Sequence, residues 1–156
     1  MKRIILILFV SIALNSGYSQ KNFEFDLGTG TMLMNKTGNI YVELTGKYYF
    51  KKDVGVDLSA SSTFFKSSSY GDYRFDKLGL HGIFRYPSGK METFFGFSMY
   101  QFSKSLELFK KEGMGMDLGI RLYQKLNEKI KVGTQISMSY MPELPSGVVY
   151  LGIIIM

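Results

Sequence analysis

The sequence contains no cysteine and no tryptophan, and its single histidine is His81. Without cysteine no disulfide can brace the fold, although small exported domains often rely on disulfides. One imidazole and no thiol also leave too few of the usual ligands for a transition-metal centre. We therefore expect neither a cofactor nor a metal site.

Long apolar runs are absent after the first twenty residues. At the start, two basic residues precede an apolar run from Ile4 to Leu14, and small or polar residues follow up to Gln20. This order is typical of a secretory signal peptide, and the run is shorter than the about 20 residues of a spanning helix. We expect residues 1–19 to be a cleaved signal peptide and residues 20–156 to form one exported domain.

Charge of one sign does not dominate the chain. The formal net charge is +6, but the basic residues are scattered along the sequence. Proteins that bind nucleic acids gather their lysines and arginines on one face, so we expect no nucleic-acid partner. A mild positive excess suits anionic lipid headgroups, and outer-membrane lipids are the expected partners.

The stretch IYVELTGKYYF, from Ile40 to Phe50, alternates apolar and polar side chains. Such alternation is typical of a β-strand with two unlike faces. Eight runs of this kind have lengths near the about 9–11 residues of a tilted membrane strand. They are Phe23–Leu33, Ile40–Phe50, Val54–Phe64, Arg74–Tyr86, Met91–Phe102, Gly113–Gln124, Ile130–Met141 and Val148–Met156. The predicted fold is all-β, an eight-stranded antiparallel up-and-down transmembrane β-barrel.

The connections between these runs alternate in length. Short connections are expected at 51–53, 87–90 and 125–129, and longer ones at 34–39, 65–73, 103–112 and 142–147. Outer-membrane barrels have short periplasmic turns and longer outer loops. The pattern therefore predicts that both termini are periplasmic and that loops 65–73 and 103–112 could meet a surface partner.

The polar faces of the runs are rich in glycine and serine, which suggests that they point inward. Glycine weakens an exposed strand, whereas small residues fit the narrow inside of an eight-stranded barrel. Buried charges must be paired, and the acids and bases on this face nearly balance. The expected interior polar network is Glu24, Asp26, Glu43, Lys47, Asp57, Lys77, His81, Arg85, Glu92, Asp117, Arg121 and Lys131. The apolar faces would then contact lipid, and the phase of the last strand stays open.

Aromatic residues gather at the strand ends, where outer-membrane barrels carry interfacial girdles. The expected girdle comprises Phe23, Tyr48, Tyr49, Phe50, Phe64, Phe65, Tyr73, Tyr86, Phe102, Tyr123 and Tyr140. Four methionines, Met114, Met116, Met138 and Met141, are expected on or near the lipid-facing wall.

The long alternating strands, the tight turns within FKKDVG and YPSGKM and the closing stretch VVYLGIIIM resemble the small eight-stranded outer-membrane barrels. This is the family of the OmpA transmembrane domain and the OmpX-like proteins. The resemblance implies residence in the bacterial outer membrane, insertion by the barrel-assembly machinery and a closed barrel without a wide pore. It does not imply one function, because barrels of this fold serve several.

Little in the sequence points to catalysis. Lipid-modifying barrels that resemble this chain usually need a histidine with a serine and a carboxylate near the outer rim. His81 lies in the middle of a run, in Leu80-His81-Gly82-Ile83, and no serine stands two positions further on. We name no catalytic residue and expect a structural or surface-interaction role without enzymatic activity. The alternatives are a lipid-modifying enzyme, a soluble lipocalin-like barrel that binds an apolar ligand, and a narrow channel.

Overall fold

The computed structural model describes residues 22–34, 37–65, 72–104, 111–127, 130–142 and 148–155. The predicted signal peptide and most of the loops 65–73 and 103–112 lie outside these ranges. Within the described ranges no helix is long and apolar enough to cross a membrane.

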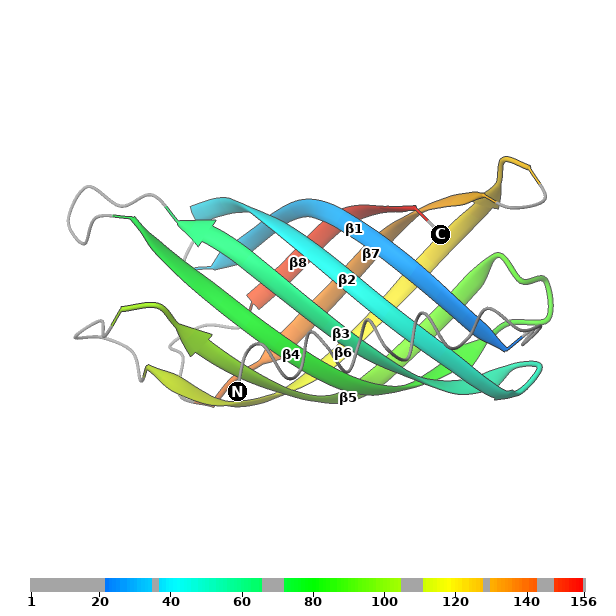
Figure 1. Ribbon diagram of the computed structural model, residues 1–156, viewed down its shortest axis with the longest axis horizontal. Coiled ribbons are helices and arrows are strands. Elements are labelled where there is room, and N and C mark those ends of the chain that lie inside the picture. The colour runs from blue at the N-terminus through cyan, green and yellow to red at the C-terminus, as the bar shows by residue number, and fades with distance from the viewer. Residues whose placement is uncertain are drawn as a thin grey trace.

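Eight antiparallel strands form a closed barrel in which each strand pairs with its neighbours in the sequence. The strands are β1 (Phe23–Met34), β2 (Thr37–Lys51), β3 (Val54–Phe65), β4 (Tyr73–Arg85), β5 (Met91–Phe102), β6 (Glu112–Lys125), β7 (Lys131–Tyr140) and β8 (Val148–Ile155). They run obliquely to the long axis (Figure 1), as closure of a barrel requires. The prediction of an eight-stranded up-and-down barrel is confirmed.

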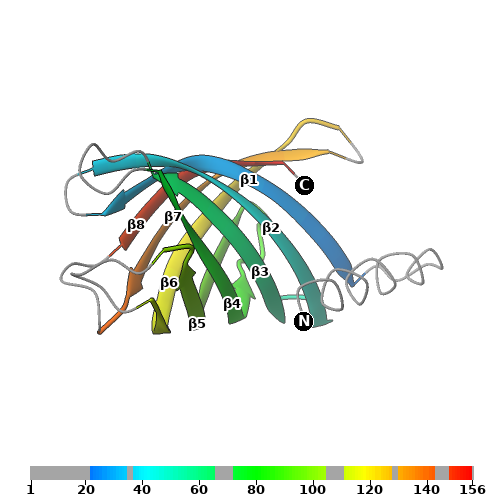
Figure 2. The same cartoon turned by 60° about the vertical axis from the view of Figure 1, so that its left-hand side comes forward.

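The first and last strands close the barrel and lie side by side in both views (Figures 1 and 2). Their register runs from Leu27 opposite Ile155 to Leu33 opposite Val149. This pairing fixes the phase of β8, because Tyr150 and Ile154 point inward and are buried. The sequence left this phase open, since both faces of β8 are apolar.

Two glycines allow the backbones to approach closely at this closing pair of strands. Gly30 and Gly152 lie opposite each other in β1 and β8. A Cβ atom on Gly30 would lie 2.0 Å from the carbonyl oxygen of Leu151, and one on Gly152 would lie 2.1 Å from the Tyr41 hydroxyl. Gly30 therefore requires glycine because the clash is with backbone, whereas a side chain at Gly152 would first displace the hydroxyl end of Tyr41.

The outer face of the barrel is a wall of exposed apolar side chains. Among its members, Ile40 is 67% exposed, Leu80 60% and Phe97 59%. Water would make such a surface unstable, whereas lipid suits it, so the apolar faces contact the membrane. We call the barrel end with the connections at 52–53, 86–90 and 126–130 the turn end, and the opposite end the loop end. The prediction of a longer connection at 34–39 is wrong, because β1 ends at Met34 and β2 already begins at Thr37.

Candidate functional site

The interior at the turn end holds a network of six charged residues, three acids and three bases. Its centre is Lys47, whose Nζ lies 2.6 Å from Asp26 Oδ2 and 2.7 Å from Glu92 Oε2. The same amine donates to the hydroxyl of Tyr123. Since Lys47 is fully buried, the two carboxylates supply the compensation that a buried ammonium needs.

Arg85 links the remaining members of this turn-end network. Its Nε donates to Glu92 Oε1 at 2.8 Å, and its Nη1 donates to Glu24 Oε1 at 3.0 Å. Lys131 Nζ lies 3.4 Å from the same Glu24 oxygen. The guanidinium also stacks over the ring of Tyr49, 4.0 Å from its centroid. Side chains from six strands thereby fill the turn end.

A second network, the middle network, surrounds His81. The imidazole Nδ1 lies 2.5 Å from Asp57 Oδ1, and Nε2 lies 3.0 Å from Asp117 Oδ2. Arg121 Nη1 donates to the other Asp57 oxygen at 2.7 Å, and Lys77 Nζ donates to Asp117 at 3.0 Å. Every member named here is buried.

Gln135 connects Glu43 to the middle network. Its Oε1 accepts a hydrogen bond from Arg121 Nε at 2.8 Å, and its Nε2 donates to Glu43 Oε1 at 3.1 Å. The network then contains three carboxylates and the cations Lys77 and Arg121. Both nitrogens of His81 can donate to carboxylates only when the ring carries two protons. A charged imidazole would bring this network, like the turn-end network, to three positive and three negative charges.

The loop end of the interior is filled by apolar side chains, which we call the inner plug. Its buried members are Met32, Met34, Tyr41, Phe65, Phe75, Tyr100, Phe102, Met141, Val148 and Tyr150, with Tyr73 packed against them. The rings of Phe75 and Tyr100 stack with centroids 5.6 Å apart. Lys77 joins the plug to the middle network, since its Nζ lies 4.2 Å from the centroid of Tyr150.

The side chains inside the two ends of the barrel correct two sequence-based expectations. Tyr49, Phe65, Tyr73, Phe102 and Tyr123, expected in the interfacial girdle, point into the barrel. Met141, expected on or near the lipid-facing wall, is also buried inside. The physical reason is that the interior needs large side chains at its ends, where few inward positions are glycine. Apolar residues then occupy both faces of a strand, and the alternation disappears.

The structure brings all twelve expected interior residues into the two networks. Glu24, Arg85 and Lys131, at the turn end, are partly exposed, and the other nine are buried. The sequence did not predict which uncharged side chains join these networks. Tyr49, Tyr123 and Gln135 contact the charged groups, but no pattern distinguishes them from other inward residues.

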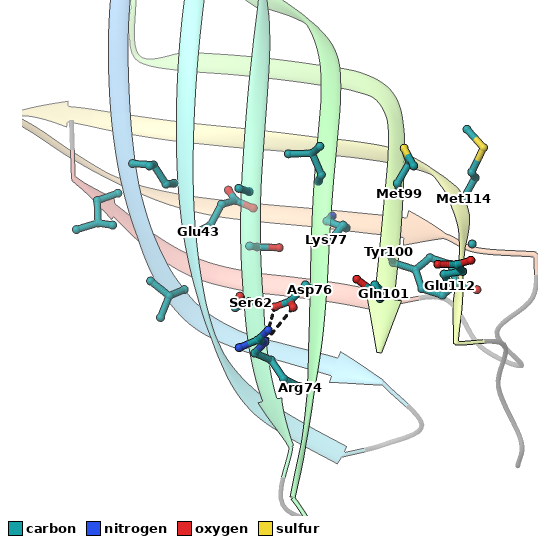
Figure 3. Close-up of a pocket in the computed structure, with 17 residues that line it drawn as sticks. Glu43, Ser62, Arg74, Asp76, Lys77, Met99, Tyr100, Gln101, Glu112 and Met114 are labelled. Carbon is teal, nitrogen blue, oxygen red and sulfur yellow. Dashed lines mark hydrogen bonds and ion pairs between the residues drawn. The ribbon is translucent and has the colours of Figure 1, made fainter. Parts of the chain in front are cut away.

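The outer wall carries a groove near the loop end, with a volume of about 960 Å³ (Figure 3). Polar side chains that line it from the lipid side are Ser62, Arg74, Asp76, Gln101 and Glu112. Apolar side chains from β1 to β6 form most of the rest of its surface. Among the described residues, no group of three or more acidic, histidine or cysteine side chains is placed to hold a metal ion.

No family model matches the sequence, and no curated protein matches it either. Solved structures do match. Neisserial surface protein A has a TM-score of 0.65 at 10% identity, over 85% of this chain and 93% of that one. The N-terminal β-barrel domain of Pseudomonas aeruginosa OprF has a TM-score of 0.60 at 11% identity, over 88% and 97%. The outer-membrane enzyme PagL has a TM-score of 0.56 at 12% identity, over 83% and 97%.

The chain has the fold of the small eight-stranded outer-membrane barrels. The resemblance inferred from the sequence is thereby confirmed for the fold, and the apolar outer wall agrees with it. The identities are too low to carry a function across, and the neighbours of this outer-membrane barrel include an enzyme as well as a surface protein.

Proposed function

We propose that the chain is a non-enzymatic barrel of the bacterial outer membrane with a closed interior. Its role is structural or lies in surface interaction through the outer loops 65–73 and 103–112. The observation that carries this proposal is the filling of the interior from one end to the other. The turn-end network, the middle network and the inner plug follow one another along the barrel.

This filling argues against a channel and against a lipocalin-like ligand cavity. Lys47 and Glu92 come from β2 and β5, which are not paired in the sheet, so their 2.7 Å contact crosses the interior. Arg121 on β6 and Asp57 on β3 make a second such contact at 2.7 Å. An ion would have to separate buried ion pairs, each of which is costly to break.

The position of His81 argues against the lipid-modifying alternative. Both of its ring nitrogens contact carboxylates, and only 3% of the residue is exposed, on the inner side of the wall. An imidazole in this state has no lone pair with which to activate a hydroxyl group. It also lies on the side of the strand that faces away from lipid.

Three measurements test the proposal. Boiled and unboiled protein from isolated outer membranes should differ in gel mobility, because a closed barrel resists detergent until heated. The wild type in a planar bilayer should give no steady conductance. A deletion strain should keep its lipid A and phospholipid acylation profile.

Other results would overturn the proposal in different ways. Steady conductance would make the chain a channel. An altered lipid profile that wild type restores would make it an enzyme, and failure of His81→Ala to restore it would assign the base. Insertion should depend on the barrel-assembly machinery, and release of soluble protein into the periplasm would refute the membrane placement.

If the role lies in surface interaction, the outer loops should be needed for binding but not for folding of the barrel. Replacement of residues 66–71 by a Gly-Ser segment of equal length should leave the heat-dependent mobility unchanged, because these residues lie outside the strands. Binding to any surface partner should decrease. The same replacement in the short turn 87–90 is the matched control.

A further inference from the structure

Five polar residues gather on the lipid-facing side of the barrel near the loop end, in a wall made otherwise mostly of apolar side chains and threonines. Four of them form a continuous row across adjacent strands. Ser62 on β3 lies opposite Asp76 on β4, Asp76 lies opposite Gln101 on β5, and Gln101 lies opposite Glu112 on β6. Arg74 stands two positions before Asp76. We call these five residues the polar row.

The polar row lies at the height of the lipid headgroups. Asp76 is three positions from the loop-end terminus of β4, Gln101 is one position from that of β5, and Glu112 is the first residue of β6. A charged side chain on the lipid face costs about 2–4 kcal/mol at the midplane and about 0–1 kcal/mol near the interface. The charged side chains of the row therefore cost little free energy only if they lie among the lipid headgroups.

One end of the polar row holds a preorganised guanidinium. Asp76 accepts a hydrogen bond from Ser62 Oγ at 2.6 Å and one from Arg74 Nε at 2.9 Å (Figure 3). The two terminal amino groups of Arg74 have no partner among the residues that the structure describes. Arginine in this arrangement presents a fork that matches the oxygens of a phosphate group.

The other end of the polar row carries an acid. Gln101 and Glu112 line the groove on its far side (Figure 3), and no ion pair of Glu112 occurs within the described part of the chain. Because Arg74 and Asp76 compensate each other, the row as a whole has an excess negative charge. A purely anionic headgroup would face this uncompensated carboxylate.

The floor of the groove is apolar and continues toward the middle of the wall. Its apolar side chains are Leu27, Val42, Leu44, Leu78, Met99 and Met114, with Ala60 among them. Glu43, Ser61, Lys77 and Tyr100 also line the groove, but these residues are buried, with their side chains inside the barrel. Ala60 lies between Leu44 and Leu78 in the sheet, and its small side chain leaves the hollow between these two. A groove that is polar at headgroup height and apolar below has the polarity of a lipid in one leaflet.

We propose that this groove binds a phospholipid whose headgroup carries a phosphate and a primary ammonium group, as phosphatidylethanolamine does. The phosphate lies against Arg74, the ammonium donates to Glu112 and Gln101, and an acyl chain lies along the floor. The charge pattern selects this class, because both signs of the headgroup meet the opposite sign on the protein. The inference rests on the membrane placement proposed above and specifies the lipid partner.

Native mass spectrometry of the detergent-purified barrel tests this assignment. The protein is titrated with phosphatidylethanolamine, phosphatidylcholine and phosphatidylglycerol that share the same acyl chains. Phosphatidylethanolamine should be retained roughly fivefold better than the other two, the usual size of one added charged contact. The quaternary ammonium of phosphatidylcholine cannot donate a hydrogen bond, and phosphatidylglycerol has no cation.

Two variants separate the contributions of the two ends. Glu112→Gln should lower the retention of phosphatidylethanolamine more than that of phosphatidylcholine, because the quaternary ammonium loses a charge attraction but no hydrogen bond. Arg74→Gln should weaken both lipids by a similar factor. Asp53→Asn and Lys125→Gln, at a half-buried and an exposed residue of the turn end, are the matched controls and should change neither.

Several outcomes would overturn the assignment. These are equal retention of the three lipids, a preference for phosphatidylglycerol, or retention that neither variant alters. A protein dimer that Arg74→Gln abolishes would show that the polar row joins two copies instead. Loss of heat-dependent mobility in the wild type, measured before lipid is added, would refute the barrel in the membrane, which is a different failure.

Discussion

Lys47 and Glu92 form a fully buried ion pair, Nζ to Oε2 at 2.7 Å, between two strands that the sheet does not pair. Their contact spans the interior and braces opposite parts of the wall. Lys47→Met leaves Glu92 and Asp26 without their shared cation. We expect a loss of about 3–5 kcal/mol in the free energy of unfolding, because buried Asp26 loses its cation, although Glu92 keeps its contact with Arg85. Urea unfolding in lipid vesicles measures it.

The double variant Lys47→Met with Glu92→Gln controls for this interpretation. Its loss should be smaller than the sum of the two single losses, since the two side chains interact directly. Additive losses would show that the contact contributes nothing of its own.

His81 should carry two ring protons at neutral pH, because both nitrogens face carboxylates. ¹⁵N NMR of the labelled imidazole in micelles should show two protonated nitrogens with similar shifts. A neutral ring would give two widely separated shifts, and the middle network would then hold one excess negative charge. His81→Gln should lower stability, since Gln cannot supply that positive charge.

Gly30→Ala should impair closure of the barrel. The new Cβ atom would lie 2.0 Å from the Leu151 carbonyl oxygen, and this backbone atom cannot move without breaking the pairing of β1 with β8. The fraction of protein with heat-dependent mobility should decrease sharply. Gly82→Ala is the matched control, because its nearest neighbour would be the Phe95 carbonyl oxygen at 3.8 Å. Equal folding of both variants would contradict the steric argument.

The inner plug should stabilise the loop end. Phe75 is fully buried and packs against Tyr100 and Phe102. Phe75→Ala should therefore cost about 3–5 kcal/mol in the free energy of unfolding. Phe97→Ala removes the same ring from the lipid-facing wall, where lipid can fill the space, and should cost less. Thermal unfolding in the same detergent compares the two.

The alternation of side chains was sufficient to predict the fold and the charged interior. Runs such as that from Ile40 to Phe50 carry charges on one face only, so their phase is unambiguous. Where both faces are apolar, the alternation left the phase of β8 open, and the predicted placement was wrong at the ends that hold Phe65 and Phe102. There the sequence cannot distinguish a ring that fills the interior from one that faces lipid.

The outer groove could not be found from the sequence for a different reason. Ser62, Asp76, Gln101 and Glu112 belong to four strands, and only the register of the barrel brings them into one row. Asp76 also lies at one of the alternate positions of β4 that the sequence assigns to the lipid-facing side, where most strands carry apolar side chains.

The pairing of β1 with β8 has a consequence for the timing of folding. Leu27 meets Ile155, a partner that ribosomes add more than a hundred residues later. Until then β1 keeps an unpaired edge that could associate with other chains. Contacts between residues so distant in sequence also form slowly. The barrel therefore cannot close until β8 is present, and the chain is prone to aggregate before that. We expect it to need a chaperone during export.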